Sequence, residues 1–101
     1  MKFIITFFKF AFIATASATT FIPSLNSNCD VLLASESGCS YPGGGIDLSG
    51  QNILAAEIVY DIAPVIFYEQ EGCQGDSVTV TSSQSCFQFP FVPQCAIIRC
   101  I

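Results

Sequence analysis

The stretch Val65–Gly75, V-I-F-Y-E-Q-E-G-C-Q-G, decides the fold expected for this chain. It begins with an apolar run of β-branched and aromatic residues and ends in an acidic segment with two glycines and a cysteine. Such a run, followed by a glycine-containing turn, predicts a strand and a sharp reversal of the chain. A second strand is expected at Asp76–Thr81, because S-V-T-V-T alternates polar and apolar residues.

The first 18 residues have the layout of a secretory signal peptide. Lys2 precedes a mostly apolar run, Phe3–Ala14, and Ala16-Ser17-Ala18 has the small-x-small pattern of a cleavage site. A membrane anchor is the alternative, but the apolar run is shorter than the ~20 residues that a spanning helix needs. We therefore expect a secreted, extracellular protein whose mature chain begins near Thr19.

The mature chain is strongly acidic. Without Lys2 and Lys9, a single cation, Arg99, remains against eight aspartates and glutamates, so the formal net charge is −7. Because one cation cannot neutralise a row of phosphates, nucleic acids and anionic membrane surfaces are poor partners.

Six cysteines, all in the mature part, predict three disulfides. They are Cys29, Cys39, Cys73, Cys86, Cys95 and Cys100. Their number allows fifteen pairings, and the sequence does not choose among them. Zinc ligation is the alternative, but the chain has no histidine and no C-x-x-C pair.

Short β-prone runs separated by turn residues make up the rest of the chain. Strands are expected at Ile46–Ser49, Ile58–Ile62 and Ala96–Ile101. Phe87–Pro93, F-Q-F-P-F-V-P, contains two prolines and is expected to form an irregular packed loop. Short strands at this close spacing predict a small all-β sandwich.

One nine-residue segment occurs in two similar copies. Val31–Cys39 aligns with Val65–Cys73 at a constant offset of 34, with identical Val, Gly and Cys positions. Two copies of one supersecondary unit, packed face to face, would form one domain. A chance match is the alternative for so short a segment.

Within Val65–Cys100, Tyr68 is followed by four residues, Cys73, one residue and Gly75. This spacing resembles the Greek-key motif of the βγ-crystallin superfamily, which has an aromatic, four residues, a second aromatic, one residue and a glycine. The resemblance implies a two-sheet sandwich of two Greek keys, which the disulfides expected from the cysteine count would stabilise. It also implies a folded hairpin in which Tyr68 covers a turn containing Gly72 and Gly75, the latter in a backbone conformation costly for other residues.

The same resemblance implies the domain organisation. A single βγ-crystallin-like domain is expected at residues 29–101, with motif one at 29–63 and motif two at 64–101. Residues 19–28, which contain Pro23 and a polar run, are expected to form an N-terminal arm.

The chain departs from the family pattern at its second aromatic, where Cys73 stands. In the first copy, Ala34 and Cys39 replace both aromatics. A hairpin without that aromatic packing needs another constraint. We hypothesise that disulfides through Cys39 and Cys73 provide it.

Many members of that superfamily bind calcium through an Asn/Asp pair, two further residues and Ser/Thr-Ser. The matching place keeps Ser82-Ser83 but has Val78-Thr79 instead of the acidic pair. Because calcium prefers several oxygen ligands with charge among them, we expect no cofactor and no strong metal site. The candidates for a weak calcium site are Asp47, Asp76, Ser82 and Ser83.

Catalysis is not expected. Without histidine there is no Ser-His or Cys-His arrangement, and cysteines in disulfides are not nucleophiles. Glu69 and Glu71 could form a glycosidase pair only by flanking a sugar site, and carboxylates in a turn are usually solvated.

Three phenylalanines, Phe87, Phe89 and Phe91, recur at a period of two. They are expected to fill the core between the sheets. The alternative is an exposed contact patch for a partner protein or a cell-wall polymer.

Together these features predict a small secreted binding protein, effector- or toxin-like, that acts outside the producing cell on an extracellular protein or cell-wall ligand. One alternative is an extracellular structural or stress protein of crystallin type. Another is a membrane-active antimicrobial protein, which the net charge disfavours because such proteins are usually cationic.

Overall fold

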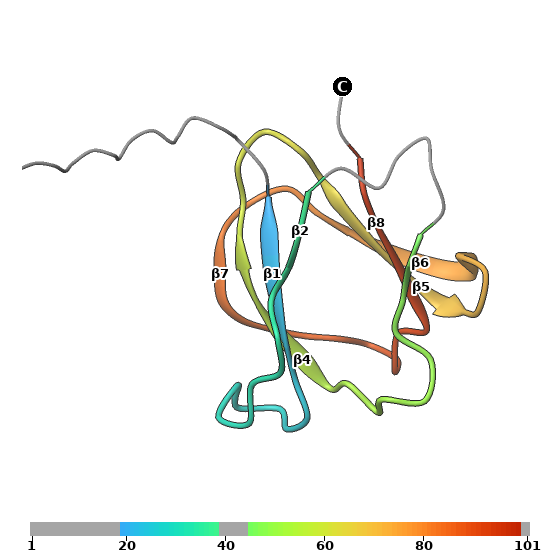
Figure 1. Cartoon of the computed structure of the whole chain (residues 1–101), viewed down its shortest axis with the longest axis horizontal. Helices are drawn as coiled ribbons and strands as arrows, with labels where there is room; N and C mark the ends of the chain where they lie inside the picture. Colours follow the sequence, from blue (N-terminus) through green and yellow to red (C-terminus); the bar gives the residue numbers. More distant parts are fainter. Residues whose placement is uncertain (1–18, 39–44, 100–101) are drawn as a thin grey trace, which may run out of the picture.

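The computed structural model describes residues 19–38 and 45–99, and this part of the chain contains eight strands and no helix (Figure 1). The strands are β1 (Thr20–Ser24), β2 (Glu36–Ser37), β3 (Ile46–Asp47), β4 (Ala55–Val59), β5 (Val65–Gln70), β6 (Gln74–Val80), β7 (Gln84–Gln88) and β8 (Cys95–Ile98). They form two antiparallel four-stranded sheets: sheet A in the order β2-β1-β4-β7, and sheet B in the order β3-β8-β5-β6. The prediction of an all-β sandwich is confirmed.

The strand, turn and strand expected from Val65–Gly75 are present as β5 and β6. Alternation along β5 places Val65 and Phe67 in the core, whereas Ile66 and Tyr68 are half-buried. Most of β6 is exposed, and its last residue, Val80, is buried. One apolar face and one solvated face are typical of an antiparallel hairpin packed on a core.

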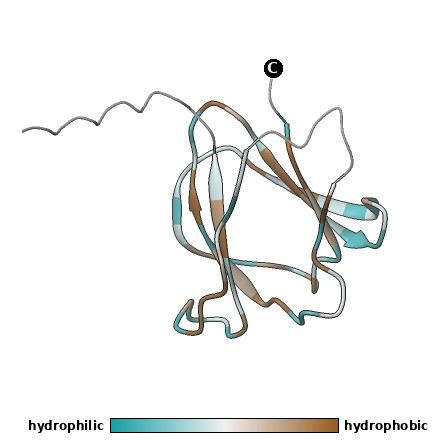
Figure 2. Ribbon diagram, viewed as in Figure 1, coloured by the Kyte–Doolittle hydropathy of each residue, from teal (hydrophilic) through white to brown (hydrophobic). Residues whose placement is uncertain are grey.

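The core lies between the two sheets. Phe21 of β1 meets Phe67 of β5 edge to face, with ring centroids 5.1 Å apart. Phe67 also contacts Phe89, at 4.6 Å between centroids. Apolar residues line the inner parts of the strands, while the β5–β6 turn is hydrophilic (Figure 2). The remaining buried members of the core are Leu48, Ile53, Ala56, Ile58, Ala63, Val65, Val80, Ala96 and Ile98.

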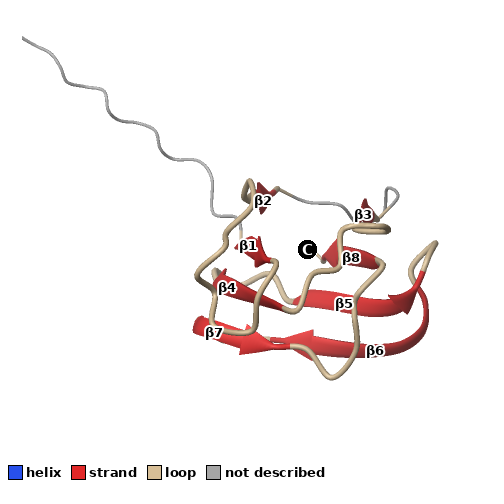
Figure 3. Ribbon diagram, turned by 90° about the horizontal axis from the view of Figure 1, so that it is seen from below, coloured by secondary structure: helices blue, strands red, loops and turns tan. Residues whose placement is uncertain are grey.

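Each sheet takes three strands from one half of the chain and one from the other. β3, from the first half, pairs with β8, and β7, from the second half, pairs with β4. Seen from below, β2 and β3 lie along one side of the molecule, and β7 and β6 lie along the opposite side (Figure 3). The two halves are therefore joined by strand pairing as well as by the core.

The pairing register shows a structural repeat. Ser24 lies opposite Ala55 in sheet A as Tyr68 lies opposite Cys95 in sheet B. The Ser24 carbonyl also accepts the N–H of Leu54, the residue before Ala55, at 3.0 Å. In the same way, the Tyr68 carbonyl accepts the N–H of Gln94, the residue before Cys95, at 2.8 Å. Ser24 is thus the counterpart of Tyr68, 44 residues earlier. The offset of 34 predicted from Val31–Cys39 does not match this repeat.

The structure also differs from the arm expected at residues 19–28. Thr20–Ser24 forms β1, an inner strand between β2 and β4, and Phe21 is fully buried. Pro23 is tolerated there because its carbonyl accepts the Leu33 N–H at 2.8 Å on the side away from β4. The nitrogen of a strand residue faces the same side as its carbonyl, so the missing N–H costs no bond to β4.

Strand β7 is a further difference, because Phe87–Pro93 was expected to be irregular throughout. Phe87 lies within β7 and pairs with Ala56 of β4. Both prolines of the segment follow the end of this strand at Gln88. They interrupt the chain after the pairing is complete, so the loop expectation holds only for the residues after β7.

Alanine at Gly75 should lower stability, and Gly50 provides a matched comparison. Both have φ near +80° (81° and 78°), which costs an L-residue about 1–2 kcal/mol. A Cβ on Gly50 meets nothing within 4 Å, whereas one on Gly75 would lie 2.9 Å from two side-chain carbons of Gln70. We expect G50A and G75A each to lower the free energy of unfolding by about 1–2 kcal/mol in urea titrations. Where G75A lowers stability more than G50A, we expect the added substitution Q70A to remove the difference, because it removes the side chain that the new Cβ meets. A difference that persists in Q70A/G75A would contradict this explanation.

Candidate functional site

Two cysteines at equivalent places in the two halves have left-handed backbone. The φ angles are 59° at Cys29 and 57° at Cys73, and the two residues are 44 positions apart. Left-handed backbone is uncommon outside glycine. Cys29 is bonded to Cys86 and Cys73 to Cys95, so both turns are held by disulfides. The counterpart of Cys73 is therefore Cys29.

The Cys73–Cys95 disulfide connects the β5–β6 turn with the first residue of β8. It agrees with the hypothesis that Cys73 is held by a disulfide. The other cysteine of that hypothesis, Cys39, lies outside the described residues, as does Cys100. Gly45 packs against this disulfide, since a Cβ on it would collide with both sulfur atoms.

The residues expected to shape the hairpin lie around this disulfide. Tyr68 is half-buried in β5, and its carbonyl accepts the Gln94 N–H at 2.8 Å. Gly72 is in the turn with φ of 74°, and Gly75 follows in β6. Three of the four residues Gly72–Gly75 thus have positive φ, which makes the reversal tight.

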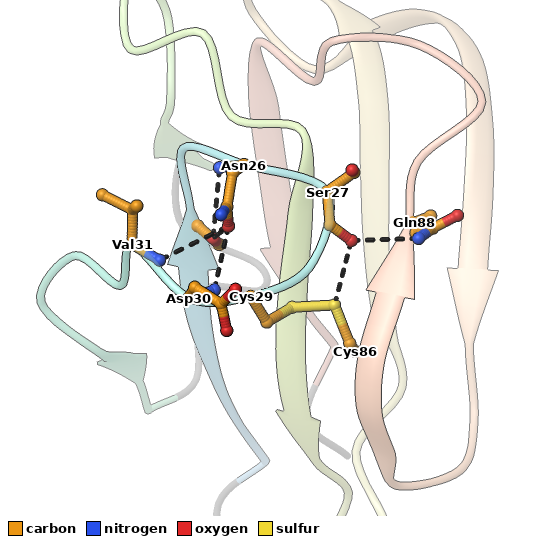
Figure 4. The surroundings of a disulfide bond; sticks show 8 residues. Asn26, Ser27, Cys29, Asp30, Val31, Cys86 and Gln88 are labelled. Atoms are coloured by element: carbon orange, nitrogen blue, oxygen red, sulfur yellow. Dashed lines mark hydrogen bonds between the residues drawn. A yellow bond between two sulfur atoms is a disulfide. The ribbon is translucent and has the colours of Figure 1, made fainter.

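The side chain of Asn26 organises the loop after β1 (Figure 4). Its Oδ1 accepts bonds from the Asp30 N–H at 2.9 Å, from the Val31 N–H at 3.4 Å and from the Ser24 hydroxyl at 2.9 Å. The buried Ser24 is satisfied in this way. An amide side chain thus replaces backbone pairing within the loop.

The Cys29–Cys86 disulfide joins this loop to β7 (Figure 4). Beside it, Gln88 Nε2 donates to the Ser27 carbonyl at 2.9 Å. Cys86 Sγ lies 3.4 Å from the same oxygen, a packing contact because a disulfide sulfur carries no hydrogen. Strand β7 is therefore held to the loop by one covalent bond and one hydrogen bond.

Four exposed apolar residues lie on this loop and just before β4, and we name them the apolar patch. Its members are Leu25, Val31, Leu32 and Leu54, exposed by 40%, 48%, 46% and 42%. Their backbones are adjacent: Leu25 N–H donates to the Val31 carbonyl, Leu54 N–H to the Ser24 carbonyl, and Leu32 bridges to Ser24. Exposed apolar residues on adjacent segments form a candidate interaction site, whereas single exposed ones are common on any surface.

The phenylalanines considered as a contact patch lie elsewhere. Phe87 and Phe89 are half-buried, pack against the core, and contact each other at 5.5 Å between ring centroids. Phe91 is half-buried in the following loop. The structure thus places Phe87 and Phe89 at the core rather than on an exposed surface.

The four calcium candidates are dispersed. Asp47 is in β3 and Asp76 in β6, at opposite edges of sheet B. Ser82 Oγ accepts from Gln84 Nε2 at 2.9 Å, and Ser83 Oγ accepts the Tyr60 N–H at 3.0 Å. Among the described residues, no three His, Cys, Asp or Glu side chains gather as a metal site would need.

Asp47 has a local structural role. Its Oδ1 accepts the Ser49 hydroxyl at 2.7 Å and the Ser49 N–H at 2.9 Å. Both bonds hold the pKa of Asp47 below its ordinary value of 3.8, and the bond from the Ser49 hydroxyl has the larger effect. Because the folded-state pKa is lowered, the ionised group stabilises the fold above its ordinary pKa, and this contribution is lost as the pH falls through the lowered value.

We expect S49A to raise the pKa of Asp47 toward 3.8, since the hydroxyl is the largest cause of its shift. The measurement is an NMR titration of the Asp47 carboxyl carbon. S82A is the control, because that hydroxyl bonds Gln84 and no carboxylate, and it should leave the titration unchanged. An unchanged pKa in S49A would show that the backbone bond alone sets it.

Glu69 and Glu71 are exposed at the β5–β6 turn. Residues 19–38 and 45–99 contain no helix with the length and apolarity of a membrane span.

Comparisons with protein families, with curated proteins and with solved structures find no match to this chain.

Sequence reasoning missed the apolar patch. Leu25 stands alone between Ser24 and Asn26, whereas Leu54 and Val31-Leu32 belong to apolar runs of the kind that usually enter a core. Their convergence depends on backbone bonds across the loop after β1. The one local clue was Asn26, an asparagine two residues after Ser24, where asparagine commonly stabilises turns.

Proposed function

We propose that this chain is a secreted domain of βγ-crystallin type, built from two Greek-key motifs, that acts by binding and not by catalysis. The strand orders support two related motifs. Read from β6, sheet B has the order β6-β5-β8-β3, in which β6, β5 and β8 take the places of β2, β1 and β4 in sheet A. The fourth strand of each sheet, β7 or β3, comes from the other half of the chain. The equivalent backbone bonds at Ser24 and Tyr68 also support the relation. The motif pattern Tyr68-x₄-Cys73-x-Gly75 adds the family resemblance.

An extracellular site of action is supported by covalent chemistry and by the N-terminal sequence. The disulfides Cys29–Cys86 and Cys73–Cys95 are compatible with an oxidising compartment. The pattern of Met1–Ala18 fits export. We place the protein in the effector- or toxin-like class of small secreted chains that act on an extracellular protein or cell-wall ligand.

The apolar patch is the observation that carries a binding function. Four side chains exposed by 40–48% come from segments fixed by hydrogen bonds, and the Cys29–Cys86 disulfide fixes the same loop. A rigid apolar surface binds with little loss of conformational entropy. Asp30 is exposed within this loop and places one charged residue beside the apolar ones.

The patch is tested with the double variant L25S/L32S and the control V59S. Val59 is 51% exposed on β4, at the end of that strand away from Ala55, so it matches the patch residues in exposure but not in place. Surface substitutions of this kind change stability by only about 0.5 kcal/mol. In pull-downs from extracellular fractions, we expect wild type and V59S to retain the same partner and L25S/L32S to lose it. Equal retention by all three would contradict binding through the patch.

Adding the purified mature protein to cells separates the alternatives. A specific response without lysis is the result expected of a binding protein. Lysis would instead favour the membrane-active reading, and inertness at all concentrations would favour an extracellular structural role.

A further inference from the structure

A second surface, independent of the apolar patch, lies along the free edge of β6. This strand has seven residues, the longest in the described part of the chain, and it ends the order of sheet B. It contains no proline and no lysine, and its one charged residue is Asp76. The edge therefore lacks the prolines and positive charges that usually prevent edge strands from pairing with other chains.

The backbone direction in β5 shows which groups face β6. The Pro64 carbonyl accepts the Arg99 N–H at 2.9 Å, so Pro64 faces β8. Direction alternates along a strand, and Ile66 therefore also faces β8. Val65 and Phe67 direct their N–H and carbonyl groups to β6.

The register then identifies the free groups of β6. Val80 lies opposite Val65, and Val78 lies opposite Phe67. The backbone groups of Val78 and Val80 therefore bond to β5. The intervening residues, Ser77 and Thr79, direct their N–H and carbonyl groups away from β5, to the outer edge. Both side chains are exposed. This edge thus offers two donors and two acceptors at the spacing of an antiparallel or parallel neighbour.

The other edges of the two sheets are shorter or covered. β2 and β3 have two residues each, too few to support a further strand. β7 is linked to the loop after β1 by the Cys29–Cys86 disulfide and by the Gln88 bond to Ser27. In the part of the chain that the structure describes, β6 is therefore the edge best suited to accept another strand.

The charge at one end of this edge selects the occupant. Glu69, Glu71 and Asp76 are all exposed at the β5–β6 turn. Tyr68 pairs with Ser77 and Gln70 with Gln74, so a β-bulge places Glu69 opposite Gly75 and Asp76 on the neighbouring strand. Like charges at such cross-strand positions are unfavourable, and a cation between them relieves the repulsion.

We propose that β6 binds an extended segment of another protein that carries lysine or arginine, as an added strand of sheet B. Backbone bonds to Ser77 and Thr79 supply affinity, and the three carboxylates select positive charge over negative charge. A second copy of this chain fits less well, because its β6 carries no lysine or arginine to meet these carboxylates.

The probe is a synthetic peptide of about ten residues, alternating valine and threonine, with lysine at both ends. We expect it to slow amide hydrogen exchange of Ser77 and Thr79 by at least about tenfold, because these amides become hydrogen-bonded. The same peptide N-methylated at alternate residues should lose this effect, since methylation removes its donors. Unchanged exchange at both amides, or equal binding of the N-methylated peptide, would overturn the proposal.

Charge selection is tested with a peptide that has glutamate in place of lysine and with the variant E69Q/E71Q/D76N. Each change should weaken binding of the probe by about three- to tenfold at low salt. Sedimentation of the free protein reports self-association, and a dimer that protects Ser77 and Thr79 would make a second copy the occupant and overturn our choice.

The substitution T79P blocks the edge from the protein side. Proline there removes only the outward N–H and leaves the bonds of Val78 and Val80 to β5. We expect T79P to abolish protection by the lysine peptide while β5 amides remain slow to exchange. If T79P unfolds, the comparison of the lysine peptide with its N-methylated form still tests whether the edge forms backbone bonds, because it uses the unaltered protein. The L25S/L32S variant should bind this peptide normally, so failure here is distinct from failure of the patch.

Discussion

Removal of the Cys29–Cys86 disulfide, in C29S/C86S, is expected to lower the free energy of unfolding by about 4 kcal/mol. Removal of Cys73–Cys95, in C73S/C95S, is expected to cost about 3 kcal/mol. The difference follows from sequence separation, which is 57 residues for the first bond and 22 for the second. A longer closed loop restricts the unfolded chain more.

Chemical denaturation of the two double variants checks this expectation. The free energy of unfolding of small domains is about 5–15 kcal/mol, so each loss is a large fraction of the total stability. The reverse order of the two losses would show that native contacts outweigh loop closure. A specific candidate for such contacts is Gly45, which packs against both sulfur atoms of Cys73–Cys95.

The second large effect is expected at Phe67. Its side chain is fully buried and contacts Phe21 from the other sheet and Phe89 from the loop after β7. F67A therefore leaves a cavity where three segments meet, and we expect a loss of about 3–5 kcal/mol in urea unfolding.

F87A is the matched control for F67A. Phe87 is half-buried and contacts Phe89 at 5.5 Å between ring centroids. Its truncation removes the same atoms but opens toward solvent, so the loss should be about half that of F67A. Equal losses in the two variants would contradict a core centred on Phe67.

The second half of the chain was more predictable than the first. Val65–Tyr68 and Ser77–Thr81 have the alternation and β-branched residues that define strands locally, and both lie at or close to the observed strands. An even number of cysteines pointed to disulfides without specifying partners. These inferences depend on residues near one another in sequence.

The first half was harder because its strands are short and its determinants are distant. β1 contains Pro23 and Ser24, and its place as an inner strand depends on which way the Pro23 carbonyl faces. The apolar run Val31–Ala34 belonged to the predicted repeat, yet Val31 and Leu32 are exposed at 48% and 46%. A sequence alignment by similarity matched that run to β5, whereas β1 is the strand that occupies the equivalent place.

The exchange of β3 and β7 between the sheets has a consequence for biosynthesis. The ribosome releases the chain from its N-terminus, and sheet A remains without its fourth strand until Gln84–Gln88 has emerged. Cys29 likewise meets its partner only when Cys86 is available. We therefore expect the first half to complete its fold only after β7 has emerged. Until then the β4 edge that pairs with β7 is open, and unpaired strand edges are prone to aggregation.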